Sequence, residues 1–309
     1  MSSVGILYSP RYLEHDAGPG HQESPQRLVA VWDHLQETGL LAQLKRLNPV
    51  SHKEAWIETL YNRQYIQRVQ AACERGERFM DTPDTGIGPK SFEVACLAVD
   101  GVLTLVDAVI EGKVGCGFGL LRPPGHHAER GLALGFCLFN NVGIAARYAQ
   151  QHHGLKRVAI VDWDVHHGNG TQHAFEEDPT VFYASTHQWL LYPGTGPREE
   201  QGKGNVLNIP LAPGSGDEEI VRVFQDEIIP ALDQFQPEMV LISAGFDAHR
   251  NDPLAYLQVT EEGFRRMTEL VVAAARRHAS GRIVSVLEGG YHRPSLARSV
   301  EAHLAALMA

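Results

Sequence analysis

The feature that most constrains the fold is a series of short, β-rich runs, most of which are nearly continuous in apolar residues. They occupy residues 4–8, 115–123, 157–164, 180–185, 205–211, 239–245 and 282–290. A strand with one face in water alternates apolar and polar side chains, whereas a strand of a parallel sheet is covered on both faces and is apolar throughout. The runs therefore predict a mostly parallel sheet buried between two layers.

Stretches with helical periodicity separate these runs, notably residues 23–39, 92–112 and 260–281. In the first of them, Ser24 is a suitable N-cap, Pro25 suits the first helical position and Gly39 is a stop signal. Strands that alternate with helices at this spacing favour a doubly wound α/β fold.

No internal repeat, low-complexity tract or long linker divides the chain of 309 residues, so we predict a single domain over residues 1–309. The segments 81–90 and 187–204 are rich in proline and glycine, which is typical of structured surface loops.

The composition excludes several classes of protein. The net charge of −10 and the absence of a dense basic cluster argue against nucleic acid as a direct partner. No window approaches the roughly 20 apolar residues of a membrane span, and no secretory signal is visible, so we expect a cytoplasmic protein. The four cysteines are scattered, which indicates reduced thiols rather than a disulfide framework: Cys73, Cys96, Cys116 and Cys137.

Polar segments follow four of the apolar runs: RPPGHHAERG, DWDVHHGNG, AGFDAHRNDP and EGGYHRP. In parallel α/β sheets, ligands bind beyond the carboxyl ends of the strands. The competing interpretation is that these are solvated turns in which Asp164 and Asp247 cap helices. One such segment fits that interpretation, but four with related chemistry favour a shared site.

Asp164, His166 and Asp247 are candidate metal ligands. Residues 164 and 166 are two apart, so on a strand they would point to the same side. Two carboxylates and one imidazole make an open set of nitrogen and oxygen donors, as in catalytic zinc sites that keep a position for water or substrate.

The adjacent His126 and His127 stand in a stiff segment after two prolines and a glycine. Neutral imidazole can take up and return a proton near pH 7, so they are candidates for a general base and acid, although a surface pair is the simpler alternative. Tyr291, after Gly289 and Gly290, could stabilise an oxyanion or could simply pack.

Taken together, RPPGHHA, GFCLFNN, VDWDVHHGNGTQ, YPGTG, SAGFDAHRNDPL and EGGY resemble the zinc-dependent histone deacetylases of the arginase/deacetylase superfamily. The class II branch and its bacterial relatives are most similar, and the motifs extend from about residue 15 to residue 292. The resemblance implies a parallel eight-stranded α/β fold and the hydrolysis of an acetylated amine to acetate and free amine.

The resemblance also implies roles for individual residues. Asp164, His166 and Asp247 would bind one zinc ion, Tyr291 would polarise the amide carbonyl, and His127 would be the general base and acid. His126 would assist electrostatically, held by Asp162. The partner of His127 is Asn169, as in class II members, where class I enzymes have an aspartate.

Further positions resemble the substrate tunnel and an inner potassium site. Gly135, Phe136 and Tyr192 would form the walls around an acyl-lysine stem, and Asp84 would hold the substrate backbone at the rim. Leu254 stands where polyamine-specific relatives carry a glutamate, so an acetylpolyamine is not favoured. Asp162, Ser185 and Thr186 would contribute to potassium binding.

We therefore expect a deacetylase of acetyl-lysine in proteins or of similar acylated amines. The first alternative is a deacetylase of acetylpolyamines or other small acylamines. An arginase-type dimetal hydrolase is disfavoured by the tandem histidines and the GGY tyrosine, and a non-catalytic sensor by the complete set of catalytic residue types. The lack of a nuclear-localisation-like basic run indicates a bacterial protein. The physiological substrate, the acyl length, the oligomeric state and the choice of Zn²⁺ or Fe²⁺ are left open.

Overall fold

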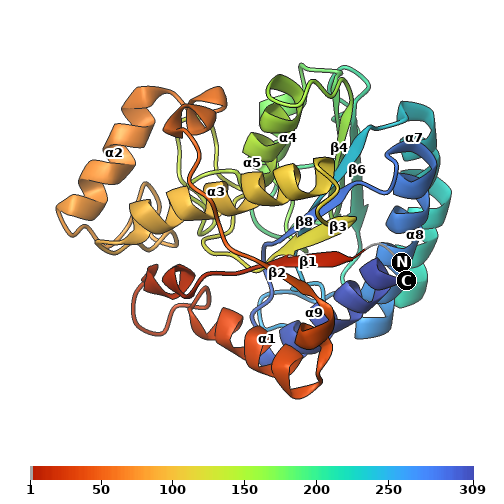
Figure 1. The fold of residues 1–309 in the computed structure, drawn as a ribbon, viewed down its shortest axis with the longest axis horizontal. Helices are drawn as coiled ribbons and strands as arrows, with labels where there is room; N and C mark the ends of the chain where they lie inside the picture. Colours follow the sequence, from red (N-terminus) through yellow and green to blue (C-terminus); the bar gives the residue numbers. More distant parts are fainter. Residues whose placement is uncertain (1–2) are drawn as a thin grey trace.

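One sheet of eight parallel strands runs through the protein in a computed structural model that describes residues 3–309 (Figure 1). In chain order the strands are β1 (Val4–Leu7), β2 (Lys45–Leu47), β3 (Cys116–Gly119), β4 (Val158–Asp162), β5 (Val181–Gln188), β6 (Val206–Leu211), β7 (Met239–Ala244) and β8 (Ile283–Leu287). Their order across the sheet is β2-β1-β3-β8-β7-β4-β5-β6, and every neighbouring pair is parallel. The predicted parallel eight-stranded sheet is confirmed.

The apolar runs form the strands in the interior of the sheet. Every residue of β1, β3, β4, β5, β7 and β8 is buried. The sequence analysis missed β2, an edge strand of three residues in which Lys45 and Arg46 are exposed. A strand at the edge needs no continuous apolar run, because one of its sides faces solvent.

Helices cover both faces of this sheet. They are α1 (Gln26–Glu37), α2 (Arg63–Glu74), α3 (Ser91–Ile110), α4 (Asn141–Gln151), α5 (Asn169–Phe175), α6 (Asp217–Val223), α7 (Ile229–Phe235), α8 (Glu261–His278) and α9 (Arg293–Met308). Helices α3 and α4 pack against the central strands on one face, while α9 packs against β1 on the other, in contact with α1 and α8 (Figure 1). This arrangement is the predicted doubly wound α/β fold.

The start of α1 differs from the prediction. The helix begins at Gln26 with Pro25 at the N-cap, and no side-chain capping bond is present there among the described residues. Ser24 contributes its backbone carbonyl, which accepts the N–H of Arg27 at 3.1 Å. Gly39 has a φ of 77°, so it adopts the left-handed conformation expected of a helix stop. None of the helices within residues 3–309 is long and apolar enough to cross a membrane.

The four polar segments follow β3, β4, β7 and β8, which are the four adjacent strands in the middle of the sheet. Because all four strands are parallel, their carboxyl ends lie at the same edge. The fold therefore brings segments that are more than 160 residues apart in sequence to one place, since β3 ends at Gly119 and β8 begins at Ile283.

Candidate metal centre and active site

The segment after β4 is shaped by two successive aspartate turns. Oδ1 of Asp162 accepts the N–H of Asp164 at 3.1 Å, and Oδ1 of Asp164 accepts the N–H of His166 at 2.9 Å. An aspartate that bonds the backbone two residues on forms a tight turn. The expectation that Asp164 and His166 share a side of the strand was wrong, since β4 ends at Asp162. The turn, rather than the strand pleat, brings them together.

Asp164, His166 and Asp247 meet at this edge. Each offers one donor atom, and these atoms all lie within 4.8 Å of one another. Nδ1 of His166 lies 3.0 Å from Oδ1 of Asp164 and 3.2 Å from Oδ2 of Asp247. Within residues 3–309, Oδ2 of Asp247 is buried without a hydrogen-bond partner. A buried carboxylate oxygen without a partner requires a cation or a water to offset its lost hydration.

Backbone groups hold the two aspartates in place. Val165 N–H donates to Oδ1 of Asp247 at 2.9 Å, and Gly289 N–H donates to Oδ2 of Asp164 at 2.8 Å. A Cβ atom at Gly245 would lie 2.2 Å from Oδ2 of Asp164, so only glycine fits there. The carboxylates are therefore fixed by groups that approach from β4, β7 and β8.

The charges of this group favour a bound cation. Burial and the adjacent Asp164 raise the pKa of Asp247 to about 7. Burial opposes a charge on His166, but Asp164 and Asp247 outweigh it and raise the pKa of this imidazole to about 10. A dication between the three side chains would lower the pKa of both Asp247 and His166. The donor set, its spacing and the unpartnered oxygen fit a single divalent metal ion.

The structure does not support the alternative in which the aspartates cap helices. The N-cap of α5 is Gly168, and the N-cap of α8 is Thr260. Asp247 instead bonds Val165, which is 82 residues earlier in the chain. The polar segments are therefore a tertiary assembly and not local turns.

Among residues 3–309, Asp107, His152 and His153 form a second group with metal-type side chains. Here both carboxylate oxygens have partners. Oδ1 of Asp107 accepts from the Tyr148 hydroxyl at 2.8 Å and lies 2.7 Å from Nε2 of His153, while Oδ2 lies 3.1 Å from Nε2 of His52. This group is a hydrogen-bonded surface cluster that needs no ion to satisfy its carboxylate.

His126 and His127 lie beside the first group, and both are buried. Nδ1 of His126 lies 3.0 Å from Oδ2 of Asp162, and its Nε2 lies 3.7 Å from Oδ1 of Asp164. Nδ1 of His127 lies 2.7 Å from Oδ1 of Asn169. Each imidazole therefore uses Nδ1 for a positioning partner, which leaves Nε2 as its second nitrogen.

The two histidines differ in charge. Burial opposes the charged form of His126, but Asp164 and Asp162 outweigh it and raise its pKa to about 10. Burial, together with His126 and His166, holds the pKa of His127 well below its usual value. His127 is therefore neutral at pH 7, which is the state that a general base requires.

A narrow pocket of about 220 Å³ leads to these groups. It is lined by Asp84, Pro124, His126, His127, Gly135, Phe136, His166, Leu191, Tyr192, Leu254, Gly289 and Tyr291. The five residues predicted for substrate binding are all in this set. Phe136 stands perpendicular to Tyr291 with ring centroids 5.9 Å apart, and Tyr192 stands perpendicular to His127 at 5.1 Å. The lining combines apolar and aromatic side chains with a few polar groups, as is typical of sites for small molecules.

Besides Phe136, an aspartate and an arginine contact Tyr291 at the pocket. Its backbone N–H donates to Oδ2 of Asp252 at 2.7 Å, and the guanidinium of Arg27 lies 4.9 Å from the centre of its ring. Burial raises the pKa of Tyr291 well above its usual value. The hydroxyl therefore stays protonated and can donate a hydrogen bond.

The residues predicted for potassium lie behind the metal group. Asp162 and Ser185 are paired across β4 and β5, and Thr186 follows on β5. Oγ1 of Thr186 is one of the buried side-chain atoms without a partner in the described chain. Potassium itself stays a prediction.

Sequence reasoning missed several buried charged residues that support the site. Oε2 of Glu288 accepts the backbone N–H of Gly125 at 2.7 Å and of His126 at 3.3 Å, so it anchors the histidine loop. Arg122 forms a bidentate pair with Glu23 at 2.5 and 2.7 Å. The only sequence signal for Arg122 and Glu288 was their place beside the motifs, at the end of an apolar run.

Comparisons with known proteins indicate the family of this chain. A family model described as "Histone deacetylase domain" matches residues 21–307. The chain is 38% identical over 287 residues to the "Histone deacetylase-like amidohydrolase" of Pseudomonas aeruginosa, with 91% of this chain and 75% of that protein covered. It is 40% identical over 297 residues to the human "Polyamine deacetylase HDAC10", with 90% and 43% covered. A solved structure, "Crystal Structure of HDA15 HD domain", superposes with a TM-score of 0.94 at 36% identity, with 100% of this chain and 90% of that chain covered.

Proposed function

The chain belongs to the histone deacetylase domain family, and on that premise we propose that it is a zinc-dependent enzyme that removes acetyl groups from the side-chain amine of acetyl-lysine or from similar acylated amines. As a member it is a deacetylase, a hydrolase of amide bonds. The observation that carries the proposal is the group of three metal-type side chains that reaches the pocket through His166, because one of its carboxylate oxygens is buried without a partner among residues 3–309.

Asp164, His166 and Asp247 would hold the zinc ion. When bound, zinc supplies a Lewis acid that polarises the amide carbonyl and makes a water molecule more acidic. Two carboxylates and one imidazole leave a coordination position for water or substrate, which is typical of catalytic zinc.

His127 moves the proton. Its neutral imidazole takes a proton from the attacking water as the water oxygen bonds to the carbonyl carbon. The carbon–nitrogen bond then breaks, and His127 returns the proton to the leaving amine. The products are acetate and the free amine.

Tyr291 and His126 stabilise charge during this step. The protonated hydroxyl of Tyr291 donates a hydrogen bond to the carbonyl oxygen as that oxygen becomes negative. His126, paired with Asp162 at 3.0 Å, keeps a positive charge near the developing anion. Asn169 positions His127 through its bond at 2.7 Å.

The walls of the pocket favour an acetyl-lysine side chain. Phe136 and Tyr192 are aromatic, and Gly135 leaves room for an aliphatic stem between them. Asp84 at the pocket would accept hydrogen bonds from the substrate backbone. Leu254 offers no charge to a polyamine cation, so acetylpolyamines are the second candidate, supported by the similarity to human polyamine deacetylase HDAC10.

A panel of substrates tests the proposal. We expect the zinc-loaded protein to hydrolyse an acetyl-lysine peptide with a higher kcat/KM than acetylputrescine or acetylspermidine, and to lose activity in a chelator. The reverse order would favour the second candidate. Activity that persists in the chelator would contradict the metal-dependent reaction.

Three further expectations stay predictions from the sequence. They are the potassium site of Asp162, Ser185 and Thr186, the bacterial origin and the cytoplasmic location.

A further inference from the structure

A chain of polar side chains leads from His127 away from the substrate pocket. Nδ1 of His127 lies 2.7 Å from Oδ1 of Asn169, whose Nδ2 donates to Oε1 of Glu129 at 2.5 Å. The same Glu129 oxygen lies 2.7 Å from Nδ1 of His173. Asn169 and His173 are four residues apart in α5, so they face Glu129 from one side of that helix. The catalytic roles assigned so far make no use of Glu129 or His173.

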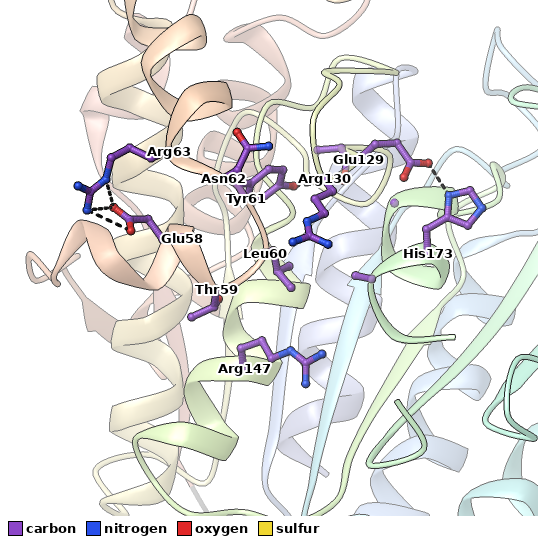
Figure 2. Close-up of a pocket in the computed structure, with 13 residues that line it drawn as sticks. Glu58, Thr59, Leu60, Tyr61, Asn62, Arg63, Glu129, Arg130, Arg147 and His173 are labelled. Carbon is purple, nitrogen blue, oxygen red and sulfur yellow. Dashed lines mark hydrogen bonds and ion pairs between the residues drawn. The ribbon is translucent and has the colours of Figure 1, made fainter. Parts of the chain in front are cut away.

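The chain of side chains ends at a second cavity. Glu129 and His173 line a cavity of about 460 Å³ that also includes Glu58, Arg63, Arg130 and Arg147. Figure 2 shows Glu129 joined to His173 at this cavity, with Arg130 and Arg147 among the side chains around it. In the described chain, it shares no lining residue with the substrate pocket. Because Glu129 does not line the substrate pocket, its route to the reaction runs through Asn169 and His127.

The orientation of the Asn169 amide decides which nitrogen of His127 is free. With Oδ1 toward His127, the amide accepts a hydrogen bond, so Nδ1 carries the proton and Nε2 has a free lone pair. With the amide turned over, Nδ2 would face the imidazole. Nδ1 would then have to accept, and the proton would sit on Nε2, where His127 could not act as a base.

Glu129 favours the first orientation because an ionised carboxylate only accepts hydrogen bonds. It draws the NH₂ end of Asn169 to its own side. A second acceptor, the backbone carbonyl of His127, lies 3.3 Å from Nδ2 and supports the same orientation with a longer bond. Hydrogen bonds to a charged group are stronger than bonds between neutral groups, so Glu129 is the main constraint.

We propose that Glu129 is a positioning residue of the deacetylase: it fixes the Asn169 amide so that Nε2 of His127 stays free to take a proton, and His173 holds Glu129 in place. This inference rests on the proposed role of His127 as the general base. It differs from a merely structural role, because Glu129 then acts on the tautomer of His127 and not only on the packing of α5.

Two substitutions of Glu129 distinguish an effect of the Asn169 amide orientation from an effect of the carboxylate charge. In Glu129→Gln the Oε1 atom still accepts from Asn169, whereas Glu129→Met removes both acceptor oxygens of this side chain. With the zinc-loaded full chain, we expect Glu129→Met to lower kcat about tenfold with KM changed by less than about twofold, and Glu129→Gln to retain kcat to within about threefold. Glu301→Met is the matched control, because Glu301 makes a similar contact of 2.7 Å with His34. It should leave kcat unchanged.

The ¹⁵N NMR spectrum of the His127 ring is a readout that does not depend on activity. The signals of this ring are assigned as those that disappear in His127→Gln. We expect the wild type and Glu129→Gln to show the Nδ1–H tautomer, and Glu129→Met to show a mixture. A single Nδ1–H tautomer and wild-type kcat in Glu129→Met would overturn the proposal. An equal loss in Glu129→Gln and Glu129→Met would also overturn it, because charge and not orientation would then matter.

If Glu129→Met does not fold, exchanging the acid and the amide between positions 129 and 169 provides a second test. Asn169→Asp places two carboxylates in contact and should lower kcat. The double variant Asn169→Asp with Glu129→Gln restores a donor at 129 for the new acceptor at 169, so kcat should rise at least about fivefold above Asn169→Asp. No rise would contradict the proposal. If the wild type hydrolyses none of the acetylated substrates, the proposed function fails, and the NMR tautomers still decide the role of Glu129.

Discussion

Gly289 packs so tightly against Asp247 that a Cβ atom at position 289 would lie 1.9 Å from Oδ2 of Asp247. The same atom would lie 2.6 Å from Oδ2 of Asp164. The metal group is thus closed on one side by a backbone that has no side chain. Gly289, the first glycine of the pair before Tyr291, therefore leaves room for both carboxylates of the metal group.

Gly289→Ala should weaken zinc binding. Its methyl group would push both aspartates out of position, and changes around metal ligands typically lower affinity about 10–100-fold. Competition with a chelator, followed by calorimetry, measures the affinity. Gly131→Ala is the control, since a Cβ atom there meets nothing within 4 Å. Equal affinity in both variants would mean that the two aspartates are not ligands.

Tyr291→Phe should lower kcat by about 10²–10³-fold, as the loss of other oxyanion donors does. The ring stays in place against Phe136 and Arg27, so zinc content and thermal stability should change little. Steady-state kinetics on an acetyl-lysine peptide measures the effect. Wild-type turnover in the variant would remove Tyr291 from the reaction.

Metal binding should release protons at pH 7. Without a metal, Asp164 and Asp247 raise the pKa of His166 to about 10 against the opposing effect of burial, and burial together with Asp164 raises the pKa of Asp247 to about 7. A ligand imidazole must be neutral and a ligand carboxylate ionised, so loading should release at least about one proton. The affinity should therefore rise with pH between pH 6 and 8. Calorimetry in buffers of different ionisation enthalpy counts the protons, and a count near zero would contradict the assignment.

His303 should make the protein less stable in acid. It is buried, its two nitrogens lie 2.8 Å from the hydroxyls of Thr268 and Ser285, and burial lowers its pKa to about 3. The unfolded chain binds a proton at this residue below its ordinary value of about 6.5, and the folded chain does not until about pH 3. The free energy of unfolding should thus fall with decreasing pH below 6.5, by up to about 1.4 kcal/mol per pH unit from this group.

Urea unfolding between pH 7.5 and 5 tests this linkage. In His303→Gln the slope of stability against pH should be shallower by about that amount, even if the variant is less stable at every pH. An unchanged slope would show that His303 does not titrate between the two states.

Leu254→Glu should shift the substrate preference toward polyamines. A carboxylate in the pocket would attract the cationic chain of acetylspermidine, so its kcat/KM relative to an acetyl-lysine peptide should rise about tenfold. Leu254→Gln has the same length as the glutamate variant without its charge and should not show the shift. A similar change in both variants would assign the effect to shape.

Local patterns predicted much of this molecule. The apolar runs at 157–164 and 239–245 predicted buried parallel strands, and the structure has β4 and β7 there. The polar residues at the ends of these runs were the right candidates for a shared site. Burial on both faces leaves a continuous apolar signature, so such strands can be read from sequence alone.

Other features left little local signal. The edge strand β2 has only three residues, two of them charged. Glu288 bonds the loop that holds His126, 162 residues away, and Glu129 bonds Asn169, 40 residues away. A glutamate beside a motif has the same appearance in sequence whether it is exposed or positions a catalytic group.

The sequence by itself determined the parallel α/β class, the edge of the sheet where the chemistry lies and the residue types that meet there, because strand burial and strand ends are properties of neighbouring residues. Only the tertiary structure decided the order of the strands, the turn that aims Asp164 and His166 at Asp247, and the path from His127 through Asn169 to Glu129. These relationships depend on which distant segments pack together, and that packing is set by the free energy of the whole core.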